Sequence, residues 1–77
     1  MPRRSKADPV ALAFGSAVRT ARQARGETLE DVARRIARMD AKYLGEIERG
    51  WHAPSISTAK RIADALHMSL AALARDI

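Results

Sequence analysis

The sequence predicts an all-α fold, a compact bundle of five short helices packed around one core. Two observations lead to this prediction: apolar residues recur at helical spacing along the chain, and the composition is rich in alanine and poor in aromatic residues. Hydrophobic residues make up 47% of the 77 residues and charged residues 30%, which is the balance of a globular protein. A chain of this length forms one domain with a small core.

The first helix is expected to begin at Pro9 and to end at Gly26, with Asp8 as its N-terminal cap. Proline is accepted in the first turn because the N–H that it lacks would have no partner inside the helix. The residues expected to form the buried stripe of this helix are Val10, Phe14, Ala17, Val18 and Ala21. Residues 9–77 are therefore expected to fold as one domain.

Residues 1–8 are expected to form a flexible, basic N-terminal arm. Arg3, Arg4 and Lys6 outweigh Asp8 in charge, and the arm has no apolar periodicity that would fold it. Such an arm can lie along the phosphates of a nucleic acid, although three basic residues more often mean a solvated tail.

Residues 28–50 predict two short helices joined by a tight turn, which is the size of a helix-turn-helix. Thr28 can cap the first of these helices with its hydroxyl, and Asp31 can accept a hydrogen bond from the free N–H of Thr28. The apolar residues that then share one helical face are Leu29, Val32, Ala33 and Ile36. Spacing alone is equally compatible with an ordinary helical hairpin.

The second helix of this pair is expected over residues 41–49, after a turn at Arg38 and Met39. Asp40 is its expected cap, and Gly50 is well placed as its left-handed C-terminal stop. The apolar positions of this helix are Tyr43, Leu44 and Ile47.

Two further helices are expected after a loop that contains Trp51 and His52. Ser55 can cap the fourth helix, and Ser69 can cap a short last helix. The fourth helix is expected to bury Ile56, Ala59, Ile62, Ala63 and Leu66, and the last helix carries Leu70, Leu73 and Ile77. We expect Trp51 to cover the core, because a lone tryptophan in such a loop is more often a lid than a contact surface.

The overall charge is that of a protein that meets a polyanion. Fourteen Lys and Arg against nine Asp and Glu give a net charge of +5. The absence of cysteine from the sequence excludes a disulfide framework and fits a reducing compartment. No apolar run approaches the roughly 18 residues that span a bilayer, and the N-terminus lacks the apolar segment of a signal peptide. We therefore expect a cytoplasmic protein without a membrane partner.

The sequence contains no catalytic constellation. His52 and His67 have no acidic or thiol partners at ligand spacing, so we expect neither a metal site nor a general base. A chain this small also has little room for a pocket. We expect no cofactor, no small-molecule ligand and no enzymatic activity.

Residues 14–73 resemble the lambda-repressor-like helix-turn-helix domain of the Cro/repressor, or XRE, family of transcription regulators. The resemblance rests on three patterns in order, AVRTARQARGETLEDVA, YLGEIERG and APSISTAKRIADALHMSLAAL, and covers about four fifths of the chain. It implies a five-helix DNA-binding domain in a sequence-specific transcription regulator. Its partner would be double-stranded DNA, bound at a palindromic operator by a homodimer.

The resemblance implies that residues 41–49 form the recognition helix, with the N-terminal end in the major groove. At the positions that match the family's base-reading sites, Lys42 can donate to guanine, Ala41 can contact a thymine methyl and Glu46 can accept from cytosine. The residues expected beside this site or at the DNA backbone are Thr28, Arg34, Arg38, Asp40, Tyr43 and Arg49.

The chain also departs from the family pattern. Leu29 stands where many members carry a glutamine that contacts a phosphate, and Asp40 and Glu46 add negative charge beside the reading edge. These three residues favour an alternative function, a protein-interaction module of the same fold, such as an antitoxin that binds a toxin. Lys42 and the arginine-rich faces favour DNA.

Two further expectations concern the assembly of the domain. Glu48 matches a family position that often pairs with a basic residue of the first helix, here Arg22, and a partly buried carboxylate needs such a partner. At the C-terminus we expect Leu70, Leu73 and Ile77 to form a dimer interface, because one small domain cannot bury them all. The alternative is that all three close the core of the monomer.

Overall fold

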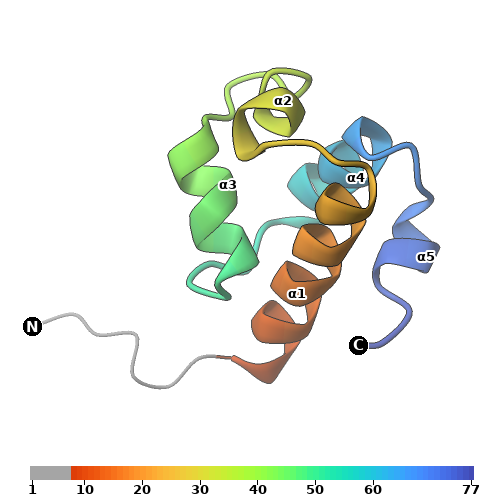
Figure 1. The fold of residues 1–77 in the computed structure, drawn as a ribbon. Coiled ribbons are helices and arrows are strands. Elements are labelled where there is room, and N and C mark those ends of the chain that lie inside the picture. Colours follow the sequence, from red (N-terminus) through yellow and green to blue (C-terminus); the bar gives the residue numbers. More distant parts are fainter. Residues whose placement is uncertain (1–7) are drawn as a thin grey trace, which may run out of the picture.

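The structure, a computed structural model, describes residues 8–77, and every regular element in that range is an α-helix (Figure 1). The helices are α1 (Pro9–Ala24), α2 (Leu29–Ala33), α3 (Ala41–Glu48), α4 (Ile56–Ala65) and α5 (Leu70–Leu73). The predicted all-α fold with five helices is therefore confirmed. Residues 1–7 of the predicted arm lie outside the described range, whereas Asp8 accepts a hydrogen bond from the N–H of Val10 at 2.9 Å and caps α1.

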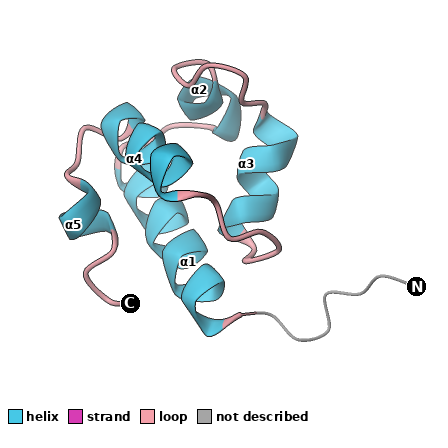
Figure 2. Cartoon of the chain, turned by 180° about the vertical axis from the view of Figure 1, so that it is seen from behind, coloured by secondary structure: helices cyan, strands magenta, loops and turns pink. Residues whose placement is uncertain are grey.

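The helices are arranged around α1, which runs through the middle of the molecule. α1 packs against α3 and α5, α2 packs against α3 and α4, and α4 packs against α5. The two opposite views place α2 and α3 on one side of α1 and α5 on the other (Figures 1 and 2). The helix-turn-helix pair and the C-terminal segment therefore form separate surfaces.

The helices begin at the caps that the sequence predicts. The caps are Asp8, Thr28, Asp40, Ser55 and Ser69, and each side chain accepts from a backbone N–H of the first turn. Thr28 and Asp31 bond reciprocally: the hydroxyl accepts from the N–H of Asp31 at 3.0 Å, and the carboxylate accepts from the N–H of Thr28 at 2.9 Å. Gly26 and Gly50 have φ angles of 69° and 78°, a left-handed conformation that stops a helix.

The core draws on all five helices. Ile47 of α3 and Ile62 of α4, both predicted to point inward, are completely buried. The largest fully buried side chains are Leu44, Ile47, Ile62, Leu66, Leu73, Val18 and Val32. No buried polar or charged residue interrupts this core within residues 8–77.

Two residues that the sequence places in the core are exposed instead. Val10 is 51% exposed, because the buried face of α1 is formed by residues on a slightly different line, namely Ala11, Phe14, Gly15 and Val18. Ile56 is 79% exposed, because it opens the first turn of α4 and the described chain does not cover that turn. Both predictions of burial are therefore wrong.

The first helix of the pair is also shorter than predicted. The apolar pattern predicts a helix as far as Ile36, but α2 ends at Ala33. Beyond it, the N–H of Arg35 bonds to the carbonyl of Val32 and the N–H of Ile36 to that of Ala33, each at 3.0 Å, so the chain continues in tighter turns. Ile36 is still buried, so the predicted apolar face is kept although the helix is not.

Gly15 allows α1 and α3 to approach each other closely. A Cβ atom at this position would lie 2.2 Å from the carbonyl oxygen of Ile47 and 2.6 Å from that of Glu48. Both contacts are with backbone, which cannot turn away as a flexible side chain can. A glycine is therefore required where α1 crosses the C-terminal end of α3, a need that the sequence pattern does not reveal.

Gly45, on the inner face of α3, faces much looser packing. A Cβ atom there would meet Leu29 Cδ1 at 3.4 Å and the guanidinium of Arg49 at 3.5 Å, which are ordinary contacts with side-chain ends. Since Gly45 is buried against α2, it does not serve to bring the helix closer to a ligand.

The same substitution at the two glycines should have opposite effects on stability. Gly15→Ala should destabilise the fold by about 1–3 kcal/mol or more, because the methyl group overlaps backbone atoms. Gly45→Ala should be neutral or stabilise by up to about 1 kcal/mol, because alanine favours the helix. Denaturant unfolding of both variants measures the difference, and equal stabilities would show that the α1–α3 contact is looser than described.

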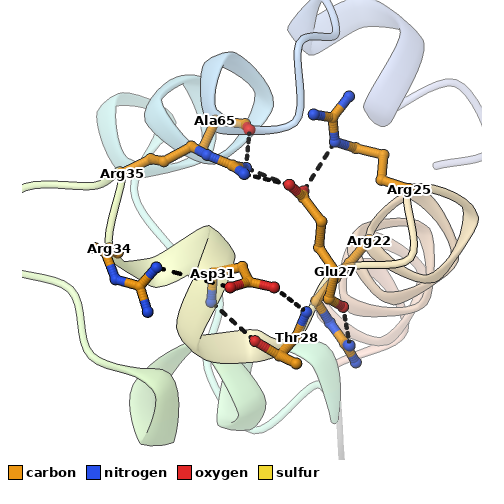
Figure 3. Close-up of polar contacts among 8 residues, drawn as sticks. All are labelled: Arg22, Arg25, Glu27, Thr28, Asp31, Arg34, Arg35 and Ala65. Carbon is orange, nitrogen blue, oxygen red and sulfur yellow. Dashed lines mark hydrogen bonds and ion pairs between the residues drawn. The ribbon is translucent and has the colours of Figure 1, made fainter.

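Glu27 links the ends of α1, α2 and α4 (Figure 3). Its carboxylate accepts from Arg25 Nε at 2.9 Å and from both terminal nitrogens of Arg35. Arg35 also donates to the carbonyl of Ala65, the last residue of α4, at 3.0 Å. The hydrogen bonds from Arg35 and Arg25 lower the pKa of Glu27 to about 2. This cluster fastens α2 to its neighbours on the side away from α3.

Glu27→Gln should therefore destabilise the protein at neutral pH, and the effect should fade in acid. The folded carboxylate has a pKa of about 2, whereas the ordinary value, which holds in the unfolded chain, is 4.5. The contribution of this carboxylate to the free energy of unfolding is complete above about pH 4.5 and is lost as the pH falls towards about 2. Thermal unfolding between pH 7 and pH 2.5 measures the difference from wild type.

The matched control for this series is Glu30→Gln, which removes an exposed carboxylate of α2 three residues away. It should leave the stability at pH 7 nearly unchanged, as surface substitutions usually do. A Glu27→Gln difference that stays constant from pH 7 to pH 2.5 would contradict the ionic role of the cluster.

Candidate nucleic-acid interface

An ion pair between α1 and α3 fixes the C-terminal end of α3. Arg22 donates from Nε and Nη2 to the two carboxylate oxygens of Glu48, at 2.7 and 2.9 Å. The side chains are only 13% and 5% exposed, and the hydrogen bond to Glu48 raises the pKa of Arg22. Arg22 also donates to the carbonyl of Glu27 at 2.9 Å. The predicted pair is thus present, and its forked geometry restrains the rotation of α3 about its own axis.

The N-terminal end of α3 is set by the turn that precedes it. Asp40 caps the helix, and its carboxylate accepts from the N–H of Tyr43 at 2.8 Å. In the turn itself Arg38 has a φ of 63°, a left-handed conformation that is uncommon for a residue other than glycine. Ala41 opens the helix and is partly buried, whereas Arg38 is exposed. The turn therefore presents an arginine beside the start of the predicted recognition helix.

Lys42, Tyr43 and Glu46 come together on the outer part of α3. The Lys42 side chain is 85% exposed, and its ammonium lies 3.5 Å from the carboxylate of Glu46. Tyr43 is 39% exposed. Glu46 is only 17% exposed, since its other oxygen accepts from His52 Nε2 at 2.8 Å. The sequence places Lys42 and Glu46 together correctly but does not reveal the histidine between Glu46 and the solvent.

His52 makes two contacts with α3 that the sequence does not predict. Its ring stacks on Tyr43 with centroids 5.0 Å apart and planes 26° apart, while Nε2 pairs with Glu46. The hydrogen bond from His52 is the largest cause that lowers the pKa of Glu46, and the charge of Lys42 acts in the same direction. The signal in the sequence is that His52 follows α3 closely, where the chain turns back past Glu46.

Arginines lie on one flank of α3. The guanidinium of Arg49 lies 4.4 Å from the centre of the Trp51 ring, a cation–π contact, and also covers Gly45. Arg49 and Arg19 of α1 line the same hollow, whose floor includes Leu29. Trp51 is 38% exposed and supports Arg49, so the expectation that it covers the core is wrong. Arg19 is a further basic residue that the sequence pattern does not place at the interface.

A second pair of arginines lies on the other flank. Arg38 of the turn and Arg61 of α4 line a hollow with Tyr43 and Thr58. Residues 43 and 45 of a helix point about 200° apart, so Tyr43 and Gly45 mark opposite flanks of α3. The exposed end of α3 is thus bordered by arginine on both sides.

Two of the residues predicted to contact the DNA backbone, Thr28 and Arg34, lie at the two ends of α2. Thr28 uses its hydroxyl to cap α2 and remains exposed. The Arg34 side chain is 73% exposed and lies 3.7 Å from Asp31, a loose surface pair. Both side chains can therefore be reached by a ligand that approaches α2 from the solvent.

The carboxylates of α3 and its cap all have partners inside the protein. Glu48 is held by Arg22, Glu46 by His52 and Lys42, and Asp40 by the backbone of the first turn. Apart from Asp40, which is exposed, the exposed charges on α3 and its flanks are cationic, on Lys42 and the flanking arginines. The surface is consequently more favourable to a polyanion than the sequence of α3 alone suggests.

The C-terminal residues do not all form the expected surface. Leu73 is only 2% exposed and packs in the core between α1 and α4, so it is not available for a dimer interface. Leu70 is partly buried against the core. Ile77, which lies beyond the end of α5, is 53% exposed. It borders an apolar hollow whose lining also includes Val10, Pro54, Ile56 and Leu70.

Within residues 8–77, no group of three or more His, Cys, Asp or Glu side chains is placed to hold a metal ion. In the same range no helix combines the length and the apolar character needed to cross a membrane.

The chain is similar to known proteins over most of its length. Residues 13–75 match the helix-turn-helix domain family. Two crystal structures of the clp gene regulator ClgR from Corynebacterium glutamicum superpose with a TM-score of 0.80; one is 32% identical and covers 86% of this chain and 84% of its own. The other is 31% identical and covers 88% of this chain and 71% of its own.

A third structure, the restriction-modification controller protein C.AhdI from Aeromonas hydrophila, is 30% identical with a TM-score of 0.75. The similarity covers 82% of this chain and 94% of that protein. No curated protein sequence matches the chain. The family match over residues 13–75 and the two regulators agree with the helix-turn-helix geometry of α2 and α3, and the chain belongs to the helix-turn-helix family of DNA-binding transcription regulators.

Proposed function

We propose that this protein is a sequence-specific regulator that binds a palindromic operator as a homodimer and inserts α3 into the major groove. The observation that carries the proposal is the charge arrangement on α3. Its carboxylates bind partners within the protein, while Lys42 and the flanking arginines remain exposed. This arrangement attracts the phosphates and leaves a donor free for a base edge.

The roles of the individual residues follow from their exposure. Lys42 is the principal base reader, because its side chain is 85% exposed in the first turn of α3 and its ammonium can donate to guanine O6 or N7. Ala41 offers a methyl contact at the start of the helix. Glu46 is predicted to accept from cytosine, but both of its oxygens already have partners, so it reaches a base only if one of these contacts breaks.

Contacts with the phosphates set the orientation of the helix on the duplex. Arg34 and Arg38 are exposed at the turn side of α3, and Arg49 is held in place by Trp51 at its other end. Tyr43 can donate its hydroxyl, and Thr28 lies at the start of α2. These residues, with the cap Asp40 behind them, form the proposed backbone-contacting set.

The alternative function, a module that binds a protein such as a toxin, rests on Leu29, Asp40 and Glu46. In the structure Leu29 packs against the core, Asp40 caps α3 and Glu46 pairs with His52. The contacts of each residue within the domain explain its presence without a protein partner. We therefore favour DNA as the main partner.

Replacement of Lys42 tests the base-reading role. A preferred duplex is first selected from a random oligonucleotide pool with the wild-type protein, and enrichment of a palindrome is expected. Lys42→Ala should then lose about 1–3 kcal/mol of binding free energy on that duplex and relax the preference at one base position of each half-site. Titration at constant salt, with each base of the site varied in turn, measures both effects.

Lys60→Ala is the matched control, because Lys60 is an exposed lysine of α4 that pairs with Asp64 at 2.5 Å. It should keep the base preference of the wild type. A loss in Lys42→Ala that is equal on all sequences would assign Lys42 to a phosphate, and failure of the wild type to enrich any duplex would contradict sequence-specific binding.

The homodimer is proposed to form through the apolar hollow at the C-terminal side. Ile77 and Leu70 are predicted to lie at this interface, and the exposed Ile56 and Val10 extend the same surface. Two copies that bury one another's hollow form an isologous contact, which relates the two α3 helices by a two-fold axis. The residues that line the hollow come from α1, α4, the loop before α4 and the C-terminal segment, and none belongs to α3, so dimerisation leaves the reading surface open.

Ile56→Asp should weaken or abolish the dimer, because it places a charge in an apolar contact without disturbing the monomer core. Sedimentation of the free protein at micromolar concentration measures the change. Ala71→Asp adds the same charge on the exposed part of α5, which does not line the hollow, and should leave the dimer intact. A wild-type protein that sediments as a monomer without DNA would contradict a stable dimer in solution.

A further inference from the structure

The contact between His52 and Glu46 connects a loop residue to the proposed base reader. One carboxylate oxygen of Glu46 lies 2.8 Å from His52 Nε2 and the other 3.5 Å from Lys42 Nζ. An ionised carboxylate only accepts hydrogen bonds, so Nε2 must carry a proton in this contact. His52 and Lys42 therefore both contact the carboxylate of Glu46, each at a different oxygen.

The His52 side chain lies against α3 and is partly exposed to solvent. Its ring is stacked on Tyr43, and its side chain is 41% exposed. The charged and titratable groups that it contacts lie on α3, namely Glu46, Tyr43 and, through Glu46, Lys42. Arg49, at the end of the same helix, is turned onto Trp51. A neutral imidazole gives the group of Lys42, Glu46 and His52 a net charge of zero, and a protonated one gives it a net charge of +1.

We propose that His52 is a positioning residue for DNA recognition, which acts by competing with Lys42 for Glu46. When the imidazole is neutral, Glu46 attracts the ammonium of Lys42 with its full charge. When the imidazole is protonated, its own ion pair with Glu46 neutralises that charge and releases Lys42 to the DNA. This role rests on the proposed function of α3 as the recognition helix, and it assigns a task to a residue outside that helix.

The consequence is a dependence of DNA affinity on pH. Imidazoles change charge between pH 5 and pH 8. Because the released lysine binds the polyanion more strongly, binding takes up a proton, and affinity rises as the pH falls. Uptake of one proton limits the change to about tenfold per pH unit, and partial uptake gives about two- to tenfold between pH 7.5 and pH 5.5.

The experiment measures the affinity of the full chain for its selected duplex at several pH values and constant ionic strength. A fluorescein-labelled duplex enriched by the wild type at pH 7.5 serves as the probe, and anisotropy gives the dissociation constant. We expect the wild type to bind about two- to tenfold more tightly at pH 5.5 than at pH 7.5. His52→Gln keeps a donor to Glu46 but cannot gain a charge, so its affinity should be nearly constant.

The second histidine provides the matched control. His67 lies in the turn after α4 with a φ of 59°, a conformation that asparagine tolerates. His67→Asn should keep the pH dependence of the wild type, which excludes a general effect of histidine charge on a basic protein. The control and His52→Gln carry their changes outside the helices, and their circular dichroism should match that of the wild type.

Lys42→Ala separates positioning from direct contact. If His52 acts by releasing Lys42, the pH dependence disappears with the lysine. A dependence that persists in Lys42→Ala would mean that the imidazolium itself contacts DNA, and one that persists in His52→Gln would remove His52 from the effect. Either result overturns the proposal, as does a wild-type affinity that is constant from pH 8 to pH 5.5. A wild type that binds no duplex at any pH overturns the proposed function itself.

Discussion

The close contact between α1 and the C-terminal end of α3 determines where every residue of the candidate interface lies. Gly15 lets the two backbones meet, and the Arg22–Glu48 ion pair next to it fixes the rotation of α3. With this end held by α1 and the other end capped by Asp40, the eight-residue helix has little freedom to tilt. Lys42 owes its exposure to this restraint, because rotation of α3 would turn it towards α2 or α4.

Contacts within the protein also account for the negative charge on α3. Glu46 and Glu48 lie two residues apart and so point to different sides of α3, where each meets a cation or donor of the protein. A carboxylate that is paired repels a phosphate much less than a free one, since its field is largely cancelled at a distance. Glu46 and Glu48 therefore make contacts within the protein, while Lys42 and the arginines on the flanks of α3 provide the charge that the proposed interface offers to DNA.

The sequence was sufficient to predict the local features of the fold. Caps such as Thr28 and Asp40, and the glycine stop at Gly50, depend on neighbours within a few residues, and the structure confirms them. Features that depend on tertiary contact were harder to predict. Val10 and Ile56 have the correct spacing for burial, but only the packing of other helices decides whether an apolar residue is covered.

The residues of the candidate site also fall into those that the sequence predicted and those that it missed. The pairing of Arg22 with Glu48 and the base-reading role of Lys42 were both predicted from the resemblance to a family pattern. His52, Arg19 and Arg61 were missed because they reach the site from the following loop, α1 and α4, and no short-range signal marks such an approach. The requirement for glycine at position 15 was missed for the same reason, since its cause is a backbone more than thirty residues away.

The position of α1 also connects the two surfaces of the domain. It packs against α3 through Gly15 and Arg22 and against α5 on its other side, so the proposed reading and dimer surfaces are joined by one continuous helix. In a two-fold dimer, a small rotation of α3 relative to α1 would occur in both copies, so the distance between the two α3 helices would change by the sum of the two displacements. Half-sites must lie about one helical turn apart, roughly 34 Å, which leaves little tolerance for such a rotation. In the proposed homodimer, the close α1–α3 contact would therefore keep the two α3 helices in register with the two halves of an operator.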